Sequence, residues 1–552
     1  MADAQGPRFP AVRAKLILHR REYLSAGLLI CAALAGALPR SALAAPVVAF
    51  TVVGKSVTEL ADAQSQGRVS SLQLVDAYLA RIRKFDRAGP ALHSVLAINP
   101  SARAQARALD RERAAGQVRG PLHGIPILIK DNIETADPLP TTAGSLALAD
   151  NVSGRDAPLV ARLRAAGAVI LGKANLSEWA NIRASVSVSG WSAVGGQTRN
   201  PYAPERSACG SSSGSAAAVA ASLAAAAVGT ETDGLITCPA ALNGLVGIKP
   251  TVGLVSRTHV VPISHSQDTP GPITHTVADA TLLLGVMAGT DPLDEATRDS
   301  AAHEQELSDT RASRGLNGVR IGVWPIAGAP PAIRDLFAAT VKRLAAAGAT
   351  VIEVEAPADA DKLGDMELTV MLTELKADLE AYLATTPPAV TVRTLADVVA
   401  FDREHAAEEM PYFEQDLFER AVTTGGLQDP QYLKALESNR LAAGRDGLDR
   451  ILASQQLQVV IAPTQGPAFL IDPVNGDAIN WSGPGNLPAI AGYPHLTLPM
   501  GMVKGLPVGL SVMGPAWSDA RLLAVGGAIE QLLGPVAAPT YGRRRARLNS
   551  SH

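Results

Sequence analysis

The stretch from residue 207 to residue 250 reads SACGSSSGSAAAVAASLAAAAVGTETDGLITCPAALNGLVGIKP. It contains a loop of small residues, a run of alanines and a second loop that holds a glycine. Gly210 and Gly214 flank three serines, so the backbone there can adopt conformations that are closed to larger residues. The alanines of 216–227 predict a buried helix, because alanine has high helix propensity and lets neighbouring elements approach closely. Ser215 is the expected N-cap of that helix.

This stretch resembles the amidase signature family, which carries a serine-rich loop, an alanine-rich helix, a Gly-Thr-Asp-Thr-Gly-Gly-Ser-Ile-like loop and an upstream lysine. Here the second loop reads Gly-Thr-Glu-Thr-Asp-Gly-Leu-Ile over residues 229–236. The lysine is Lys130, which ends a Gly-Ile-Pro-Ile-Leu-Ile-Lys motif. Residues 251–257 and 266–272 make the chain most similar to the bacterial peptide amidases of that family.

The resemblance implies a mechanism with a nucleophilic serine, a second serine held in a cis peptide, and a lysine. It assigns the role of the second serine to Ser211 and that of the lysine to Lys130, and it places the nucleophile 24 residues after Ser211. That position holds Leu235. The alignment at this position needs no gap, because Gly229-Thr230 before it and Pro239-Ala240 after it both match the family pattern.

The chemistry that the resemblance implies is coherent with the residue types. Lys130 follows the continuous apolar run of 125–129, and burial would favour the neutral lysine that a base requires. The backbone amides of Thr232, Asp233, Gly234 and residue 235 would bind the oxyanion. Leucine offers no nucleophile, and loss of a catalytic serine costs about 10⁶ in turnover in a serine protease. We therefore expect a site shaped for amide hydrolysis that lacks its attacking oxygen.

Other catalytic interpretations are weaker. Residues 210–214 match the Gly-x-Ser-x-Gly elbow of α/β-hydrolases, but that elbow follows a strand, and residues 200–206 do not read as one. Thr232 and Thr237 could replace the nucleophile only with a different loop geometry. The histidines at 123, 259, 265 and 275 and Lys173 are interpreted as structural. No metal-binding spacing occurs around Cys209 and Cys238, no His-Glu-x-x-His motif is present, and no cofactor is implied.

The alternation of apolar runs and helical patterns predicts an α/β fold. Strands are expected over 125–129 and 168–171 with a helix over 156–166 between them, and the same rhythm returns over residues 319–354. This predicts one large domain over 45–540, a mixed central β-sheet covered by helices on both faces. Helices over 366–383 and 395–408 are expected to line the entrance to the site, since such insertions vary within the family.

The first 44 residues read as a twin-arginine-type signal peptide. Arg20-Arg21-Glu22-Tyr23-Leu24 begins a short apolar run, and Ala42-Leu43-Ala44 is a small-residue cleavage site. A membrane anchor is the alternative. The signal predicts a periplasmic or secreted protein without stable membrane association after cleavage, and residues 541–552 form a basic tail. An oxidising compartment permits a disulfide between Cys209 and Cys238, although two buried free thiols are the favoured expectation.

Composition limits the partners. The 552 residues are 47% hydrophobic and 18% charged with a net charge of −3, which is typical of a soluble globular protein and gives no indication of nucleic-acid binding. The expected partner is a small amide or a peptide amide, with peptide C-terminal amides favoured by the likeness. Two alternatives stay open: an aryl or alkyl amide hydrolase, and a non-catalytic protein that binds amides. The sequence does not indicate an oligomeric state.

Overall fold

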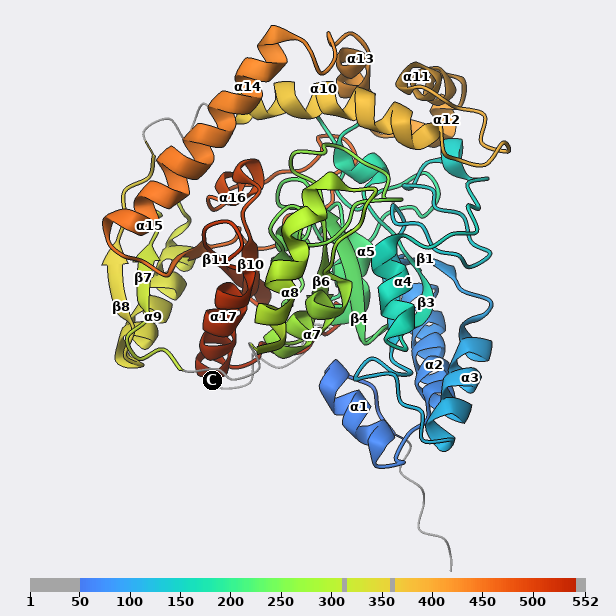
Figure 1. The fold of residues 1–552 in the computed structure, drawn as a ribbon, viewed down its shortest axis with the longest axis horizontal. Helices are drawn as coiled ribbons and strands as arrows, with labels where there is room; N and C mark the ends of the chain where they lie inside the picture. The colour runs from blue at the N-terminus through green and yellow to red at the C-terminus, as the bar shows by residue number, and fades with distance from the viewer. Residues whose placement is uncertain (1–49, 310–314, 358–362, 543–552) are drawn as a thin grey trace, which may run out of the picture. The chain divides into compact units, whose positions relative to one another are not determined.

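One mixed sheet runs through the described part of the chain. The computed structural model describes residues 50–309, 315–357 and 363–542, so the predicted signal segment and residues 543–552 lie outside it. Eleven strands within these ranges lie in the order β1-β3-β2-β4-β6-β5-β10-β11-β9-β7-β8 (Figure 1). Their bounds are β1 Val95–Ile98, β2 Pro126–Lys130, β3 Val169–Ala174, β4 Ala226–Glu231, β5 Val246–Lys249, β6 Thr269–Thr274, β7 Arg320–Val323, β8 Thr350–Glu353, β9 Val459–Pro463, β10 His495–Val503 and β11 Leu506–Met513.

The sheet contains both pairing directions. Strand β2 is parallel to β3 and β4, and β7 is parallel to β8 and β9. The other neighbouring pairs are antiparallel. All five residues of β2 are buried, as are all six of β3 and of β4, which is expected for strands covered on both faces. The predicted α/β class with a mixed central sheet is confirmed.

Helices cover both faces of this sheet, and β10 shows how. Leu496 and Leu498 face α17, whereas Thr497 between them points to the side where α6 lies. Successive side chains of a strand point to opposite faces, so α6 and α17 lie on opposite sides. The helices are α1 Val57–Ser65, α2 Ser71–Arg81, α3 Ala102–Ala114, α4 Pro158–Ala165, α5 Ser213–Ala220, α6 Thr237–Leu242, α7 Val277–Met287, α8 Ser300–Asp309, α9 Pro331–Ala346, α10 Leu363–Leu383, α11 Leu395–Glu404, α12 Ala406–Glu409, α13 Asp416–Val422, α14 Pro430–Arg440, α15 Arg450–Ser454, α16 Asn486–Ala491 and α17 Asp519–Leu533.

The alanine-rich run does not form the single helix that the sequence predicted. Helix α5 ends at Ala220, Ser222 has a positive φ of 53°, and the chain re-enters the sheet as β4 at Ala226. Pairing with β2 and β6 on its two sides outweighs the intrinsic helix propensity of alanine. The predicted cap is also wrong, since α5 begins at Ser213 and the Ser215 hydroxyl donates to the Val228 carbonyl at 3.1 Å.

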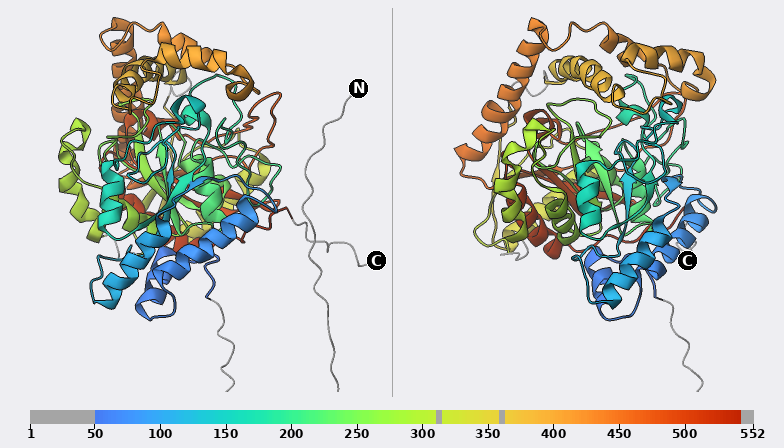
Figure 2. Two further views of the ribbon diagram at one scale, coloured as in Figure 1. Left: turned by 90° about the vertical axis from the view of Figure 1, so that its right-hand side faces the viewer. Right: turned by 45° about the vertical axis from the view of Figure 1, so that its right-hand side comes forward.

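Helices α10 to α14 form a group that we call the cap. Figure 1 and Figure 2 show them together beyond the ends of the strands. Contacts between α10 and α13, α10 and α14, and α11 and α13 hold the group together. A hydrophobic cluster separate from the main core joins α10, α11 and α13 to Trp179, Ala180 and Ile182 of the body. The cap therefore rests on the loops that follow the strands.

Tyr541, at the predicted start of the tail, stacks on Phe85 at 4.7 Å between ring centroids and donates its amide to the Pro201 carbonyl. Among the described helices, none combines the length and the apolar character needed to span a bilayer.

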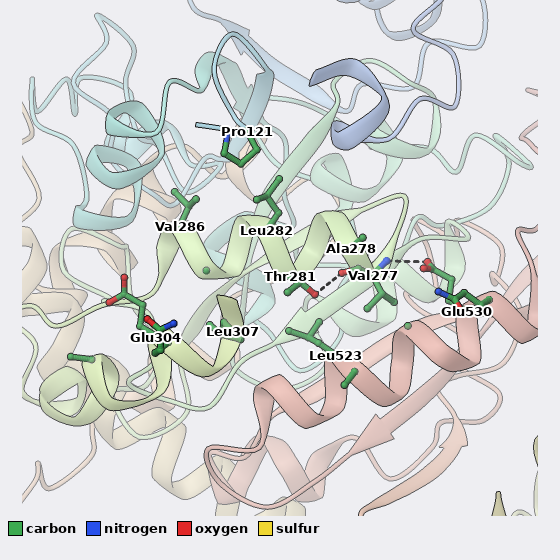
Figure 3. Close-up of a pocket in the computed structure, with 16 residues that line it drawn as sticks. Pro121, Val277, Ala278, Thr281, Leu282, Val286, Glu304, Leu307, Leu523 and Glu530 are labelled. Atoms are coloured by element: carbon green, nitrogen blue, oxygen red, sulfur yellow. Dashed lines mark hydrogen bonds between the residues drawn. The ribbon is translucent and has the colours of Figure 1, made fainter. Parts of the chain in front are cut away.

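A cavity of about 590 Å³ lies among α7, α8 and α17 (Figure 3), and none of the predicted catalytic residues lines it.

Candidate active site

Lys130 ends strand β2 inside the protein. Its side chain has no exposed surface, and its Nζ donates to Ser211 Oγ at 2.6 Å and to Thr230 Oγ1 at 2.8 Å. Burial lowers the pKa of Lys130 to about 7, against the opposing effect of the Asp268 and Glu231 carboxylates. A lysine with such a pKa is partly neutral near pH 7 and can accept a proton, which a surface lysine cannot do.

Ser211 lies next to Lys130 because of the loop before α5. The Gly210–Ser211 peptide is cis, as the resemblance implied. Ser211 is fully buried, and its neighbour Ser212 donates its hydroxyl to the Thr230 carbonyl at 3.1 Å. A side chain on Gly210 would come within 2.1 Å of Ser177 Oγ, so only glycine fits there. The loop therefore presents Ser211 to the end of β2.

Leu235 occupies the loop opposite Ser211. Its carbonyl accepts a hydrogen bond of 3.2 Å from the Ser212 amide, which brings position 235 beside the predicted lysine–serine pair. The Leu235 side chain is half-buried and packs against the cap cluster, to which α10 contributes Leu372 and Leu375. The structure thus places Lys130, Ser211 and position 235 together. At position 235 it presents an apolar side chain instead of an oxygen.

The loop between β4 and α6 has amides available for a ligand. Among the described residues, no protein acceptor takes a hydrogen bond from the amides of Asp233, Gly234 or Leu235. Gly234 has a φ of 75°, a conformation that glycine adopts without strain and that lets the loop turn at this point. Three unpaired amides beside the lysine–serine pair form the kind of cradle that stabilises an oxyanion.

Carboxylates hold this loop in place. Glu231 Oε2 accepts from the amides of Ile236 and Thr237 at 2.7 and 2.9 Å, and Asp268 Oδ1 accepts from Thr232 Oγ1 at 2.6 Å. Burial raises the pKa of Asp268 to about 6, although the Thr232 hydroxyl opposes the rise. Burial, helped by the Glu231 carboxylate, raises the pKa of Asp233 to about 7. The Glu231 and Asp268 carboxylates therefore hold the two ends of this loop in place.

Cys209 and Cys238 are joined by a disulfide, which corrects the expectation of two free thiols. The Cα atoms are 6.0 Å apart, and both residues belong to a small buried cluster with Ala468 and Phe469. Nothing in the spacing of two cysteines distinguishes a bond from close packing. Only the fold shows that the Ser211 loop and the helix after Leu235 run side by side. The bond links the two loops that carry the predicted site.

Comparison with known proteins decides the family. The Amidase family model matches residues 73–523. The chain belongs to the amidase family, a family of amide-hydrolysing enzymes. It is 38% identical to the probable amidase At4g34880 of Arabidopsis thaliana, over 87% of this chain and 90% of that protein. It is 35% identical to a glutamyl-tRNA(Gln) amidotransferase subunit from Salinispora tropica, over 88% and 98% of the two chains.

A solved amidase shares the fold. Native peptide amidase from Stenotrophomonas maltophilia superposes with a TM-score of 0.82 at 47% identity, covering 88% of this chain and 98% of that one. The likeness to bacterial peptide amidases that the motifs indicated is therefore confirmed at the level of the whole fold.

The other candidates fall outside the site. Lys173 Nζ donates to the Ile133 carbonyl at 2.6 Å and pairs with Asp131 at 3.2 Å, which agrees with its structural interpretation. The residues before the Gly210–Gly214 elbow form no strand, so the α/β-hydrolase alternative has no structural basis. Thr230 and Asp268 were missed. A side chain that acts by holding a loop has no sequence motif of its own. The available signals were the Gly229-Thr230 pair for Thr230 and the family-like residues 266–272 for Asp268.

Proposed function

We propose that this amidase site is built to hydrolyse peptide C-terminal amides to an acid and ammonia, and that Leu235 leaves this chain without the nucleophile. The observation that carries the proposal is the 2.6 Å contact between Lys130 and Ser211 in a buried site beside three unpaired amides. The preference for peptide amides rests on the similarity to peptide amidase, whose substrate class is in its name.

The proposed chemistry needs an oxygen at position 235. A serine Oγ there would attack the amide carbon while its proton passes through Ser211 to neutral Lys130. The amides of 233–235 would receive the oxyanion. As the C–N bond breaks, the proton returns through Ser211 to the leaving nitrogen, and ammonia departs. Water then hydrolyses the acyl-serine by the same route. Leucine stops the sequence at binding.

Ammonia release from a peptide amide tests the proposal with three purified proteins: the chain itself, Leu235→Ser and Leu235→Ala. We expect release only from Leu235→Ser, because alanine removes the bulk of leucine without adding a nucleophile. Equal turnover by all three would mean that another group attacks and that position 235 has been misassigned. No turnover by any of them, on peptide, alkyl or aryl amides, would refute the hydrolase proposal.

A second candidate is an amide-binding protein without turnover. The observation in its favour is the packing of Leu235 against the cap cluster, which gives the leucine an apolar environment instead of an unfilled catalytic position. Calorimetric titration of the chain with an intact peptide amide distinguishes the two. Tight binding that Leu235→Ser does not improve would support the binding role.

We also propose that the protein is exported, in line with the twin-arginine motif. The Cys209–Cys238 bond supports export, because disulfides persist mainly in oxidising compartments. Fractionation of bacteria that express the full chain tests this. Recovery of the disulfide-bonded protein only from the cytoplasm would contradict it.

A further inference from the structure

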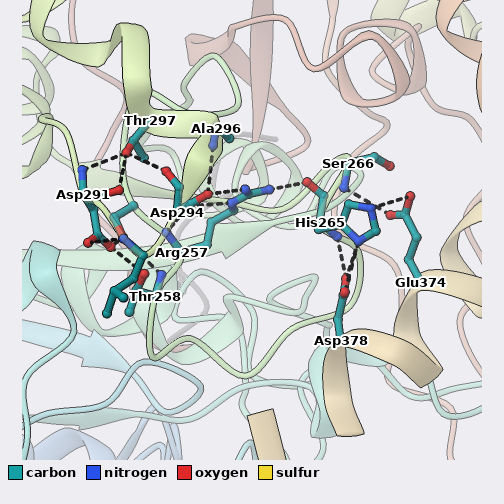
Figure 4. A network of polar contacts seen from close by, with 12 residues as sticks. Arg257, Thr258, His265, Ser266, Asp291, Asp294, Ala296, Thr297, Glu374 and Asp378 are labelled. Carbon is teal, nitrogen blue, oxygen red and sulfur yellow. Dashed lines mark hydrogen bonds and ion pairs between the residues drawn. The ribbon is translucent and has the colours of Figure 1, made fainter. Parts of the chain in front are cut away.

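A histidine outside the active site is held between two carboxylates of the cap (Figure 4). His265 Nδ1 lies 2.9 Å from Asp378 Oδ2, and its Nε2 lies 3.4 Å from Glu374 Oε1. The two acids are four residues apart on α10 and so lie on one face of that helix. The His265 amide also donates to Asp378 at 2.8 Å. Backbone and ring are therefore both attached to the cap helix.

The same acids hold the rest of this loop. Glu374 has no exposed surface and accepts hydrogen bonds from the Ser264 hydroxyl, from the Ser266 amide at 3.1 Å and from the Tyr432 hydroxyl of α14 at 2.8 Å. The segment 263–268, which we call the bridging loop, is thus tied directly to α10 and, through Glu374, to α14.

The bridging loop ends at the loop between β4 and α6, residues 232–236, which we call the oxyanion loop. Asp268 accepts from Thr232 Oγ1 at 2.6 Å and from the amides of Ile263 and Ser264 at 2.7 and 2.9 Å. Gln267 Nε2 donates to Glu367 of α10 at 2.8 Å and lies 3.4 Å from the Thr232 carbonyl. A continuous path of short contacts therefore runs from α10 through the bridging loop to Thr232, the residue directly before the three amides of the oxyanion cradle.

The geometry favours a charged ring over a metal ion. His265, Glu374 and Asp378 lie close enough to suggest three ligands. However, Asp378 faces Nδ1 and Glu374 faces Nε2, so the two acids contact different ring nitrogens, whereas a metal ion would bind only one of them. An imidazolium has an N–H on each side and satisfies both acids at once.

We propose that protonated His265 is a positioning group that fastens the cap to the oxyanion loop through the bridging loop, and that the fastening weakens when the ring loses its proton. Its effect on catalysis rests on the proposed function, whereas the fastening itself does not. The position of the oxyanion loop would then depend on the protonation of His265 as well as on that of Lys130.

The charged neighbours of His265 fix the sign of this dependence. Asp378 and Glu374 raise the pKa of His265, against the opposing effects of burial and, to a lesser extent, of Arg257. Arg257 donates to the His265 carbonyl and is itself paired with Asp294. The Tyr432 hydroxyl donates to Glu374 Oε1, the same oxygen that faces the His265 ring. A raised histidine pKa means that the fastening is complete below the ordinary value of about 6.5 and is lost as pH rises through the raised value.

Hydrogen exchange of the bridging loop and α10 tests the fastening without requiring catalysis. We would compare the chain, His265→Gln and His265→Arg at pH 6 and pH 8.5, with rates corrected for intrinsic exchange. We expect protection in the chain to fall several-fold at the higher pH, to be low at both values in His265→Gln, and to stay high at both in His265→Arg. His303→Gln, which removes a histidine 3.7 Å from Glu306, is the matched control and should behave like the chain.

The contrary outcomes are distinct. Equal protection in the chain and in His265→Gln at both pH values would overturn the proposal. A change in protection on adding zinc, reversed by a chelator, would replace it with a metal site. If His265→Gln does not fold, Asp378→Asn removes one carboxylate and should lower protection at pH 6 only in part. Unchanged protection in that variant would also count against the proposal.

A kinetic arm measures the consequence for the site in the Leu235→Ser background. We expect His265→Gln to lower kcat several-fold with little change in KM, because an oxyanion cradle acts in the transition state. His265→Arg should restore kcat. Inactive Leu235→Ser would refute the proposed function and leave the hydrogen-exchange result to decide the fastening alone. An equal loss from His265→Gln and His265→Arg would indicate a purely structural histidine.

Discussion

Lys130 shows how burial alone can prepare a residue for chemistry. Its ammonium donates to three oxygens, Ser211 Oγ and both oxygens of Thr230, and no carboxylate within the described ranges is in direct contact with it. Such a site solvates the charged form poorly, and its pKa therefore falls to about 7. Neutral lysine is the form that can accept the proton of an attacking serine. Leu235 carries no hydroxyl group, so the neutral lysine has no nucleophile at position 235 to deprotonate.

The titration of Lys130 predicts a pH profile. In the Leu235→Ser background, kcat/KM should rise as pH passes upward through about 7, because the neutral lysine is the active form. Rates of ammonia release between pH 5.5 and 9 measure this. Lys130→Met in the same background should abolish the rise, and Lys173→Met, which removes another buried lysine, is the control for folding. A rate that is flat over this range would show that Lys130 is not the base.

At the scale of single elements, α5 and the strand after it explain why this region is made of small residues. The helix is buried along its whole length between the strands and the loop that carries Asn175. Gly214 shows how tight that packing is. A Cβ built on it would lie 2.3 Å from the Ser94 carbonyl and 2.4 Å from that of Asn175.

We expect Gly214→Ala to lower the free energy of unfolding by about 1–3 kcal/mol, the usual cost of overpacking a filled core. Gly285→Ala is the matched control, because Gly285 also lies in a helix and no atom lies within 4 Å of its added methyl group. That variant should gain about 0.5–1 kcal/mol through better helix propensity and a less flexible unfolded chain. Urea denaturation measures both. Similar effects of the two substitutions would mean that α5 is not closely packed.

The disulfide connects the Ser211 loop to the helix after Leu235, across 29 residues of sequence. Replacing both cysteines by alanine should lower the free energy of unfolding by about 3–4 kcal/mol, since a loop of this length restricts the unfolded chain by about that amount. Denaturation with and without a reducing agent provides the measurement. The double variant should not respond to the reductant, and a response would point to a different origin of the effect.

At the scale of the whole molecule, the cap is attached to the body through a buried cation. Arg183 is 1% exposed, pairs with Glu178 of the body at 2.8 Å, and lies 4.4 Å from the ring centre of Phe413 beyond α12. Its guanidinium also donates to the Glu409 carbonyl of α12. Burial raises the pKa of Glu178 well above its usual value even beside Arg183. The cost of burying the carboxylate therefore offsets much of its attraction to the guanidinium.

Arg183→Met should lower the free energy of unfolding by about 3–5 kcal/mol, because it leaves the buried carboxylates of Glu178 and of Glu409, which lies 4.0 Å from Arg183, without their cation. We also expect protease to cleave the cap near α12 before the body unfolds. Arg298→Met is the matched control, since Arg298 is 69% exposed and its pair with Glu295 should contribute no more than about 1 kcal/mol. Denaturation and limited proteolysis of both variants measure the difference. Equal effects would show that the cap does not depend on Arg183.

The family and the class of fold could be predicted from sequence patterns, and both are confirmed; the same patterns predicted three positions of the site, which the structure brings together. Those inferences depend on local patterns: glycines where the backbone turns tightly, apolar runs that become buried strands, and a lysine directly after one of them. Leu235 could be placed at the nucleophile position for the same reason, because the residues on both sides of it match without a gap. Local patterns survive folding when the elements that carry them are short and regular.

The break in the alanine run, the bond between the cysteines and the groups that support the predicted site became apparent only in the folded chain. Ala226 and Ala227 become a strand because β2 and β6 offer hydrogen bonds on both sides, a gain that propensity does not contain. Asp268 and His265 act on residues far from them in sequence, through contacts with Thr232 and α10. Electrostatic and packing energies depend on distance in space, and one chain in isolation does not specify those distances until it is folded.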